Sequence, residues 1–250
     1  MYNIPADTLF IGKRLIHLPA CHSTNTVAHE MVSEGNAEDG TVIISSEQTA
    51  GQGQRGNSWE SEPGKNLTFS VILSPGIRAG HQFWLNIISC LAVSALVSKY
   101  AGDKVRVKWP NDIYFKDRKI CGILIRNYLQ GADIRNSIIG IGLNINQTAF
   151  KEPRAISLAN ICGEPFSLPQ LLEELLTQLD FYADRLRKGY LKELKEQYLS
   201  QLYWSGEQHL FKTEYQFSGT ITGIDDNGFL IVKTDEGEKY FNFKEIEFVS

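Results

Sequence analysis

The sequence predicts an α+β fold in which a mixed β-sheet is packed with helices and is followed by a small β-barrel. Three observations support this prediction. Short strand-like runs joined by tight turns dominate the first part of the chain, helical periodicity covers residues 167–199, and alternating patterns return after Trp204. We therefore expect two domains, one spanning residues 1–203 and a smaller one spanning residues 204–250.

The N-terminal part begins with a short strand at residues 14–18, and a helix follows it. Ser23, Thr24 and Asn25 are residue types that cap the N-terminus of a helix, and Gly35 ends the periodic run. The sequence therefore predicts a strand-loop-helix unit at the start of the fold.

Strands at residues 41–45 and 67–73 enclose a glycine-rich loop at residues 51–56. Its spacing fits the G-x-G-x-x-G pattern of a dinucleotide-binding turn, which must open a helix. Here Pro63 and Gly64 interrupt the chain before another strand begins. We therefore expect a hairpin loop that folds over a phosphate-bearing ligand, because glycine lets the backbone approach closely.

The segment from Ala79 to Ser98 contains no Asp, Glu, Lys or Arg, but it carries several Ser, Asn, Gln and His residues. These polar groups favour a buried helix of a globular domain over a membrane span. Four strand-like runs follow, at residues 104–108, 112–115, 119–127 and 137–145. Their short connections indicate a mainly antiparallel or mixed sheet.

The C-terminal half combines two helices with a small all-β unit. Ser167 to Gln170 predicts a capping box with an early proline, and a second amphipathic helix is expected at residues 190–199. Asn227-Gly228 and Glu236-Gly237 are hairpin turn signals, which indicate the small barrel.

Composition excludes several classes of protein. The chain has 250 residues, 42% hydrophobic content and a net charge of −4, which indicates a soluble globular protein without a nucleic-acid partner. The four cysteines are widely spaced, so we expect reduced thiols rather than disulfides or zinc ligands. The N-terminus has no basic and apolar signal segment, and a cytoplasmic protein without membrane contact is expected.

Two clusters are candidates for chemistry at a sheet end. Pro110 breaks the strand that carries Lys108, which would leave Asn111 and Asp112 with oxygens available to Mg²⁺. Lys119 opens the next strand and could reach into a cleft. Taken singly, each has an ordinary alternative: a Pro-Asn-Asp turn, or an edge lysine with its stem packed on the sheet.

The clusters taken together resemble those of the biotin–protein ligases. The resemblance extends from about Arg14 to the C-terminus, and the Lys-Trp-Pro-Asn-Asp run at residues 108–112 is its most specific part. The other matching segments are Ser-Thr-Asn at 23–25, the stretch from Gln48 to Trp59, Pro-Gly-Lys-Asn-Leu at 63–67, Arg-Lys-Ile-Cys-Gly-Ile-Leu at 118–124 and Gly-Leu-Asn-Ile-Asn at 142–146.

The resemblance implies a class II synthetase-like ligase domain followed by an SH3-like barrel. It implies an ATP-dependent biotin–[biotin carboxyl carrier protein] ligase, which activates biotin to biotinyl-5′-AMP with Mg²⁺ as cofactor. Biotin then passes to a lysine of a biotin carboxyl carrier domain of a carboxylase. The resemblance thus implies an enzyme of protein modification, in agreement with the cytoplasmic location expected above.

Residue roles also follow from the resemblance. Lys119 and Arg55 are implied as catalytic and Asp112 as the metal ligand. The implied biotin-binding residues are Ser23, Thr24, Asn25, Gln48, Gly51, Gln52, Gly53, Lys119, Gly122 and Leu124. The implied ATP and adenylate-binding residues are Gln54, Arg55, Gly56, Trp59, Lys108, Asn111 and Asn144.

The chain departs from the family pattern at two places. Many members carry arginines where this loop has Gln52 and Gln54. Members that also act as repressors carry an N-terminal helix-turn-helix domain, for which there is no room before Arg14, so a monofunctional ligase is expected. A lipoate-type ligase and a non-catalytic nucleotide-binding adaptor are the alternatives, and monomer and homodimer both stay open.

Overall fold

A computed structural model describes residues 2, 5–53 and 56–249. A seven-stranded mixed sheet forms the centre of the larger part of the molecule, with the order β1-β2-β3-β7-β6-β5-β4. Only β1 and β2 are parallel; the other neighbours are antiparallel. The strands are β1 (Leu15–Leu18), β2 (Val42–Ser45), β3 (Leu67–Leu73), β4 (Val105–Lys108), β5 (Asp112–Phe115), β6 (Arg118–Gln130) and β7 (Asp133–Leu143).

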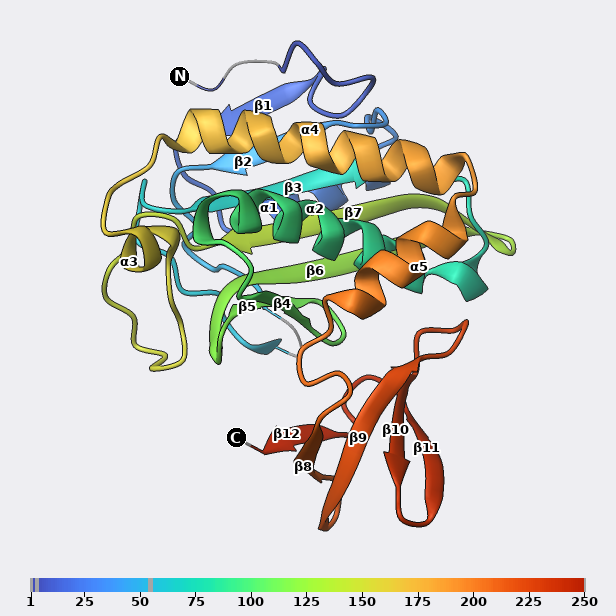
Figure 1. The fold of residues 1–250 in the computed structure, drawn as a ribbon. Helices are drawn as coiled ribbons and strands as arrows, with labels where there is room; N and C mark the ends of the chain where they lie inside the picture. The colour runs from blue at the N-terminus through green and yellow to red at the C-terminus, as the bar shows by residue number, and fades with distance from the viewer. Residues whose placement is uncertain (1, 3–4, 54–55, 250) are drawn as a thin grey trace.

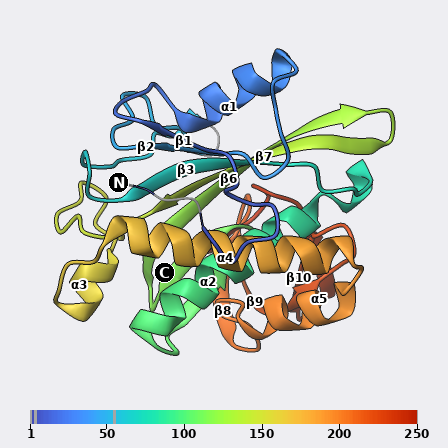
Figure 2. The same ribbon diagram turned by 90° about the horizontal axis from the view of Figure 1, so that it is seen from above.

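Helices cover both faces of this sheet (Figure 1, Figure 2). The helix α1 (Thr24–Ser33) packs on one face, over β2, β3 and β7. The other face is covered by α2 (Phe83–Ala101), preceded by the 3-10 turn η2 (Ala79–His81); α4 (Leu168–Arg187) and α5 (Leu191–Ser200) pack on α2. The short α3 (Leu158–Cys162) follows the loop after β7. The predicted mixed sheet packed with helices is therefore confirmed.

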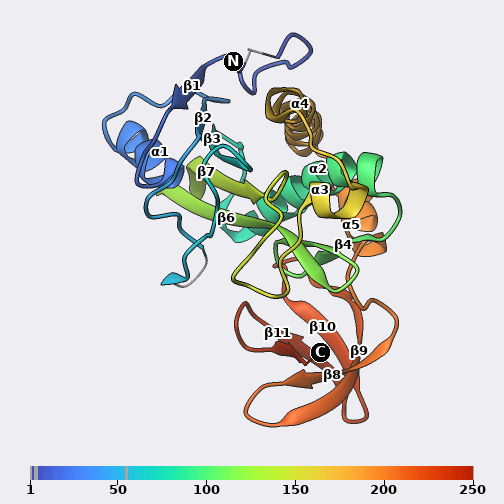
Figure 3. The ribbon, with the colours of Figure 1, turned by 90° about the vertical axis from the view of Figure 1, so that its left-hand side faces the viewer.

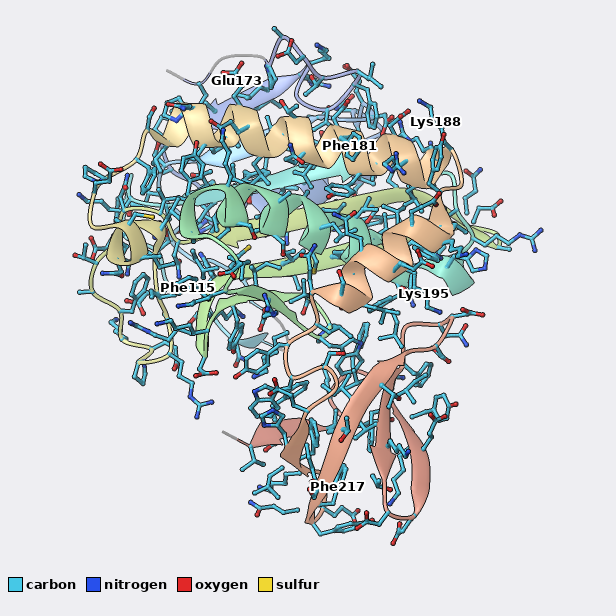
Figure 4. All side chains as sticks on the ribbon, viewed as in Figure 1. Phe115, Glu173, Phe181, Lys188, Lys195 and Phe217 are labelled. Carbon is cyan, nitrogen blue, oxygen red and sulfur yellow. The ribbon has the colours of Figure 1, made fainter. Side chains whose placement is uncertain are left out.

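The apolar segment at residues 79–101 is long enough to cross a membrane, but 72% of its most apolar stretch is buried within the fold. Its central residues Leu85, Cys90 and Leu91 are fully buried against the sheet and the outer helices. The helix α4 is amphipathic instead, and its exposed Glu173 and Phe181 point away from the sheet (Figure 4). The segment is thus the core helix of a layered domain, as the sequence predicts.

A five-stranded antiparallel sheet forms the C-terminal part, with the order β11-β10-β9-β8-β12. Its strands are β8 (Gln208–Lys212), β9 (Gln216–Ile224), β10 (Leu230–Thr234), β11 (Gly237–Phe241) and β12 (Glu247–Val249). It lies at the end of the larger part where β4, β5 and α5 lie (Figure 1, Figure 3). The predicted small all-β unit is confirmed, and the boundary between residues 203 and 204 stays a prediction.

Several polar and aromatic contacts join the two parts. The indole of Trp109 donates to the carbonyl of Gly228 at 3.0 Å, and Lys195 on α5 pairs with Asp226 at 2.8 Å (Figure 4). The Phe243 ring packs on Trp109 with 5.3 Å between ring centres. These contacts hold the C-terminal sheet close to the strands that carry the Lys-Trp-Pro-Asn-Asp run.

Two predicted helix caps are corrected by the structure. Ser23 precedes α1 and Ser167 precedes α4, but neither side chain caps its helix. A capping box is formed instead at α3, where Ser157 and Asn160 exchange hydrogen bonds with each other's backbone. Of the predicted start signals of α4, Pro169 is found in the first turn, where its missing N–H would have no partner within the helix.

Candidate active site

A cleft of about 1050 Å³ opens on the face of the sheet that carries α1. Its floor is one row of paired residues that crosses the sheet from β3 to β4. Strand registers place Thr68 opposite Gly142, Gly142 opposite Gly122, Gly122 opposite Asp112, and Asp112 opposite Lys108. Because neighbouring side chains in such a row share a face, the floor is bare over the two glycines and charged beyond them.

The bare part of the floor is occupied by the indole of Trp59. A Cβ at Gly142 would lie 2.3 Å from the Trp59 ring, and one at Gly122 would lie 3.0 Å from it. Trp59 follows the glycine-rich loop and is paired with its first residues: Trp59 N donates to Gly51 O at 2.9 Å, and Gly53 N donates to Asn57 O at 2.7 Å. The glycines thus allow one aromatic ring to lie flat on the strands.

The end of the cleft beside α1 is uncharged and internally hydrogen-bonded. Thr24 donates to Gln48 Oε1 from both its backbone nitrogen, at 2.8 Å, and its hydroxyl, at 3.2 Å. The Ser70 hydroxyl lies 2.8 Å from both Thr24 Oγ1 and Asn25 Oδ1. The Ser23 side chain is buried without capping the helix. These side chains form a rigid set of neutral donors and acceptors.

The opposite end of the cleft is charged. Lys119 Nζ lies 2.6 Å from Asp112 Oδ1, and both side chains are about one-third exposed. Tyr114 lines the same end, and its hydroxyl lies 3.4 Å from Lys108 Nζ. Burial raises the pKa of Tyr114, so its hydroxyl is protonated and neutral. Lys119 thus brings an ammonium group to this end of the cleft, where it is paired with Asp112.

Two buried polar atoms of the cleft lack a partner. Asn144 is 2% exposed; its amide nitrogen donates to Ile156 O at 3.1 Å, while its Oδ1 has no hydrogen bond. Trp59 Nε1 is also buried without a partner. Buried polar groups are nearly always hydrogen-bonded in folded proteins. Of the four such atoms among the described residues, these two belong to residues that line the cleft.

The structure brings most of the predicted site residues together. The lining contains twelve of them: Ser23, Thr24, Asn25, Gln48, Gln52, Gly53, Trp59, Asp112, Lys119, Gly122, Leu124 and Asn144. Four others lie outside the lining. Gly51 and Gly56 belong to the glycine-rich loop, Lys108 packs behind Tyr114, and Asn111 is 3% exposed with its amide donating to Ile123 O. Gln54 and Arg55 are outside the described residues.

The loop between β7 and α3 supplies lining residues that sequence reasoning missed. They include Phe150, Lys151, Glu152 and Arg154. The loop is brought to the cleft by backbone pairing, because Lys119 N donates to Arg154 O at 2.7 Å and Ile156 N donates to Lys119 O at 2.9 Å. The only local signal is a charged run at residues 151–154, which follows the end of β7 after seven uncharged residues.

Comparisons with known proteins agree with this geometry. Residues 18–144 match the Biotin/lipoate A/B protein ligase family, and residues 213–249 match the Biotin protein ligase C terminal domain. The chain is 32% identical to the bifunctional ligase/repressor BirA of Bacillus subtilis over 249 residues, covering 96% of this chain and 75% of that protein. It is 35% identical to BirA of Escherichia coli over 231 residues, covering 90% and 70%.

A solved structure supports the same assignment. The biotin protein ligase from Aquifex aeolicus in complex with biotin and ATP superimposes with a TM-score of 0.79 and is 28% identical, covering 95% of this chain and 99% of that one. Both the catalytic sheet and the C-terminal sheet therefore have counterparts among known ligases. This chain belongs to the biotin protein ligase family.

Proposed function

We propose that the cleft activates biotin with ATP and then transfers it to a lysine of a biotin carboxyl carrier domain. The observation that supports this proposal is that one cleft has a neutral, hydrogen-bonding end beside α1 and a charged end at Asp112 and Lys119. Biotin has a neutral ureido head and an anionic carboxylate, while ATP brings phosphates. A cleft that hydrogen-bonds at one end and offers ammonium groups at the other fits both at once.

The first step joins two anions. A carboxylate oxygen of biotin attacks the α-phosphorus of ATP, the bond to the bridging oxygen breaks, and pyrophosphate leaves. Lys119 is the group proposed to stand beside the reacting carboxylate and α-phosphate, where its charge offsets their repulsion and the charge of the transition state. To do so, it must exchange its 2.6 Å contact with Asp112 for the substrate.

Asp112 is the residue proposed to hold Mg²⁺. Its carboxylate lines the cleft beside Lys119. This fits Mg²⁺, which commonly uses one or two carboxylates and fills its other positions with phosphate oxygens and water. When bound, Mg²⁺ would neutralise part of the phosphate charge.

The neutral end is proposed to bind the biotin head through Ser23, Thr24 and Gln48. Gln48 Oε1 is already used by Thr24, which leaves the amide NH₂ to donate to a ligand. The orphaned Oδ1 of Asn144 is proposed to accept from adenine. In the second step the carrier lysine amine attacks the acyl carbon of biotinyl-AMP, AMP leaves, and the new amide loses a proton. Proximity supplies most of what this step needs.

Reduced thiols support a cytoplasmic location, because all four cysteines are free. The proposed acceptor is the carrier domain of a biotin-dependent carboxylase.

ATP–pyrophosphate exchange tests the proposed function. We expect exchange that depends on biotin and is absent with lipoate or with neither acid. The lipoate arm matters because the matched family includes lipoate ligases, whereas the matched C-terminal domain is that of biotin ligases. If exchange occurs with lipoate and not with biotin, lipoate is the substrate. If no exchange occurs with either acid, the proposed adenylation reaction is wrong.

A further inference from the structure

Charged side chains of both signs line the cleft around Lys119, namely Lys151 and Arg154 together with Asp112 and Glu152. The floor row ends in Asp112 and then Lys108, on β5 and β4. The Lys108 ammonium lies 4.9 Å from the centre of the Tyr114 ring, which lines the cleft. Burial lowers the pKa of Lys108; Asp112 raises it, and the nearby charges of Arg154 and Lys119 lower it again. The side chains of Lys108, Lys119 and Arg154 are therefore close enough to act on one another electrostatically.

Arg154 belongs to the loop between β7 and α3. Its carbonyl is fixed by the backbone of Lys119, and Arg118 holds the next carbonyl, that of Ala155, at 2.6 Å. Arg154 lines the cleft, and its charge acts on both Tyr114 and Lys108. Arg154 therefore lines the cleft from a loop position that is paired with Lys119. The backbone pairing with Lys119 fixes the base of the side chain and does not use the guanidinium.

The in-line geometry of phosphoryl transfer determines which part of ATP lies beyond Lys119. In phosphoryl transfer the attacking and leaving oxygens lie roughly in line through the phosphorus. The biotin carboxylate arrives from the α1 end, where Thr24 and Gln48 lie, and the α-phosphate is placed beside Lys119. The leaving pyrophosphate must then point away from α1, towards β5 and β4, where Tyr114, Lys108 and Arg154 lie.

We propose that Arg154 binds the pyrophosphate leaving group of ATP. This inference rests on the proposed adenylation reaction and adds a residue to it. A guanidinium can hold two phosphate oxygens through parallel hydrogen bonds, which an ammonium cannot. The described residues of the glycine-rich loop, 51–53 and 56, carry no charged side chain. The loop between β7 and α3 thus supplies charge from the opposite side.

The test compares reactions that contain pyrophosphate with one that does not. For Arg154→Ala, we expect the kcat/KM for pyrophosphate in pyrophosphorolysis of biotinyl-AMP to fall by about 10- to 100-fold, with a matching rise in KM for ATP. Dissociation of biotinyl-AMP, which lacks the β- and γ-phosphates, should stay within about twofold of wild type. Arg154→Lys should recover part of the loss, because it keeps the charge without the fork.

The matched control is Arg126→Ala, which removes an exposed arginine from the outer part of β6 and should change none of these values. Equal loss in pyrophosphorolysis and in adenylate retention would show that Arg154 only supports the fold, and unchanged pyrophosphorolysis would overturn the inference outright. Wild-type protein that lacks biotin-dependent exchange would instead contradict the proposed function, so the two failures are distinguishable.

Discussion

The two ends of the cleft satisfy their polar groups in opposite ways. At the neutral end, Thr24, Gln48, Ser70 and Asn25 hydrogen-bond to one another within the folded chain. At the charged end, Lys119 is held by Asp112. A substrate must break this ion pair to use Lys119, whereas it can join the neutral network without dismantling it.

This contrast separates recognition from chemistry. Neutral groups that are fixed by each other are preorganised, so binding a neutral head to them costs little ordering. Charged groups in a partly exposed cleft attract phosphates and stabilise the charge that develops during transfer. Substitutions at the neutral end should therefore change biotin affinity, and substitutions at the charged end should change reaction rates with ATP.

The largest effect is expected from Lys119→Ala. Removing one preorganised charge from the transition state should slow adenylation by about 10²–10³-fold. Biotin affinity should fall much less, since the neutral network stays intact. Single-turnover formation of biotinyl-AMP, together with calorimetric biotin binding, measures both quantities. A variant with near wild-type turnover would remove Lys119 from the catalytic role.

Gln48→Glu places a charge at the neutral end without changing side-chain size. A carboxylate can still accept from Thr24, but it cannot donate to the biotin head, so biotin affinity should fall by about 10- to 100-fold. Because protonation restores a donor, affinity should recover as the pH falls towards about 4.3, the reference pKa of a glutamate. The affinity for ATP alone should not change. A parallel loss of ATP affinity would contradict the separation of the two ends.

Gln54→Arg adds charge to the glycine-rich loop. Gln54 is outside the described residues, so this prediction rests on the sequence and on the neighbouring Gln52 and Gly53, which line the cleft. A charge-assisted hydrogen bond to the adenylate phosphate should slow release of biotinyl-AMP by about tenfold for each 1.4 kcal/mol gained. Stopped-flow measurements of the rate of biotinyl-AMP release from the wild type, from this variant and from Arg55→Ala test the prediction. If only Arg55→Ala alters release, position 54 takes no part.

The smallest effect is expected from Phe248→Ala, which acts on the charged end from the C-terminal sheet. The Lys108 ammonium lies 5.0 Å from the centre of the Phe248 ring and packs between it and Tyr114. Loss of one cation–π contact should raise KM for ATP by about two- to fivefold. Phe248→Leu, which keeps apolar bulk, is the control. A change in biotin affinity instead of KM for ATP would show that the C-terminal sheet acts elsewhere.

Most of the site could be predicted from the sequence because its residues sit in short runs tied to strand ends. Asp112 and Lys119 reach the cleft as expected, and their spacing across one turn places them on paired strands. Asn111 was expected beside them, but it is buried and holds Ile123 O instead. Asn111 lies in the turn before β5, and its hydrogen bond to β6 holds its side chain in the interior.

Local residue patterns decide the strands, the buried helix and the order of the motifs, because periodicity and turn residues act over a few positions along the chain. Contacts between distant segments decide the rest. The glycine row under Trp59 requires the register of β6 and β7, and Arg154 reaches the cleft only because its carbonyl pairs with Lys119, 35 residues away in the sequence. No local pattern encodes such pairing, since its free energy comes from packing and hydrogen bonds that exist only in the folded chain.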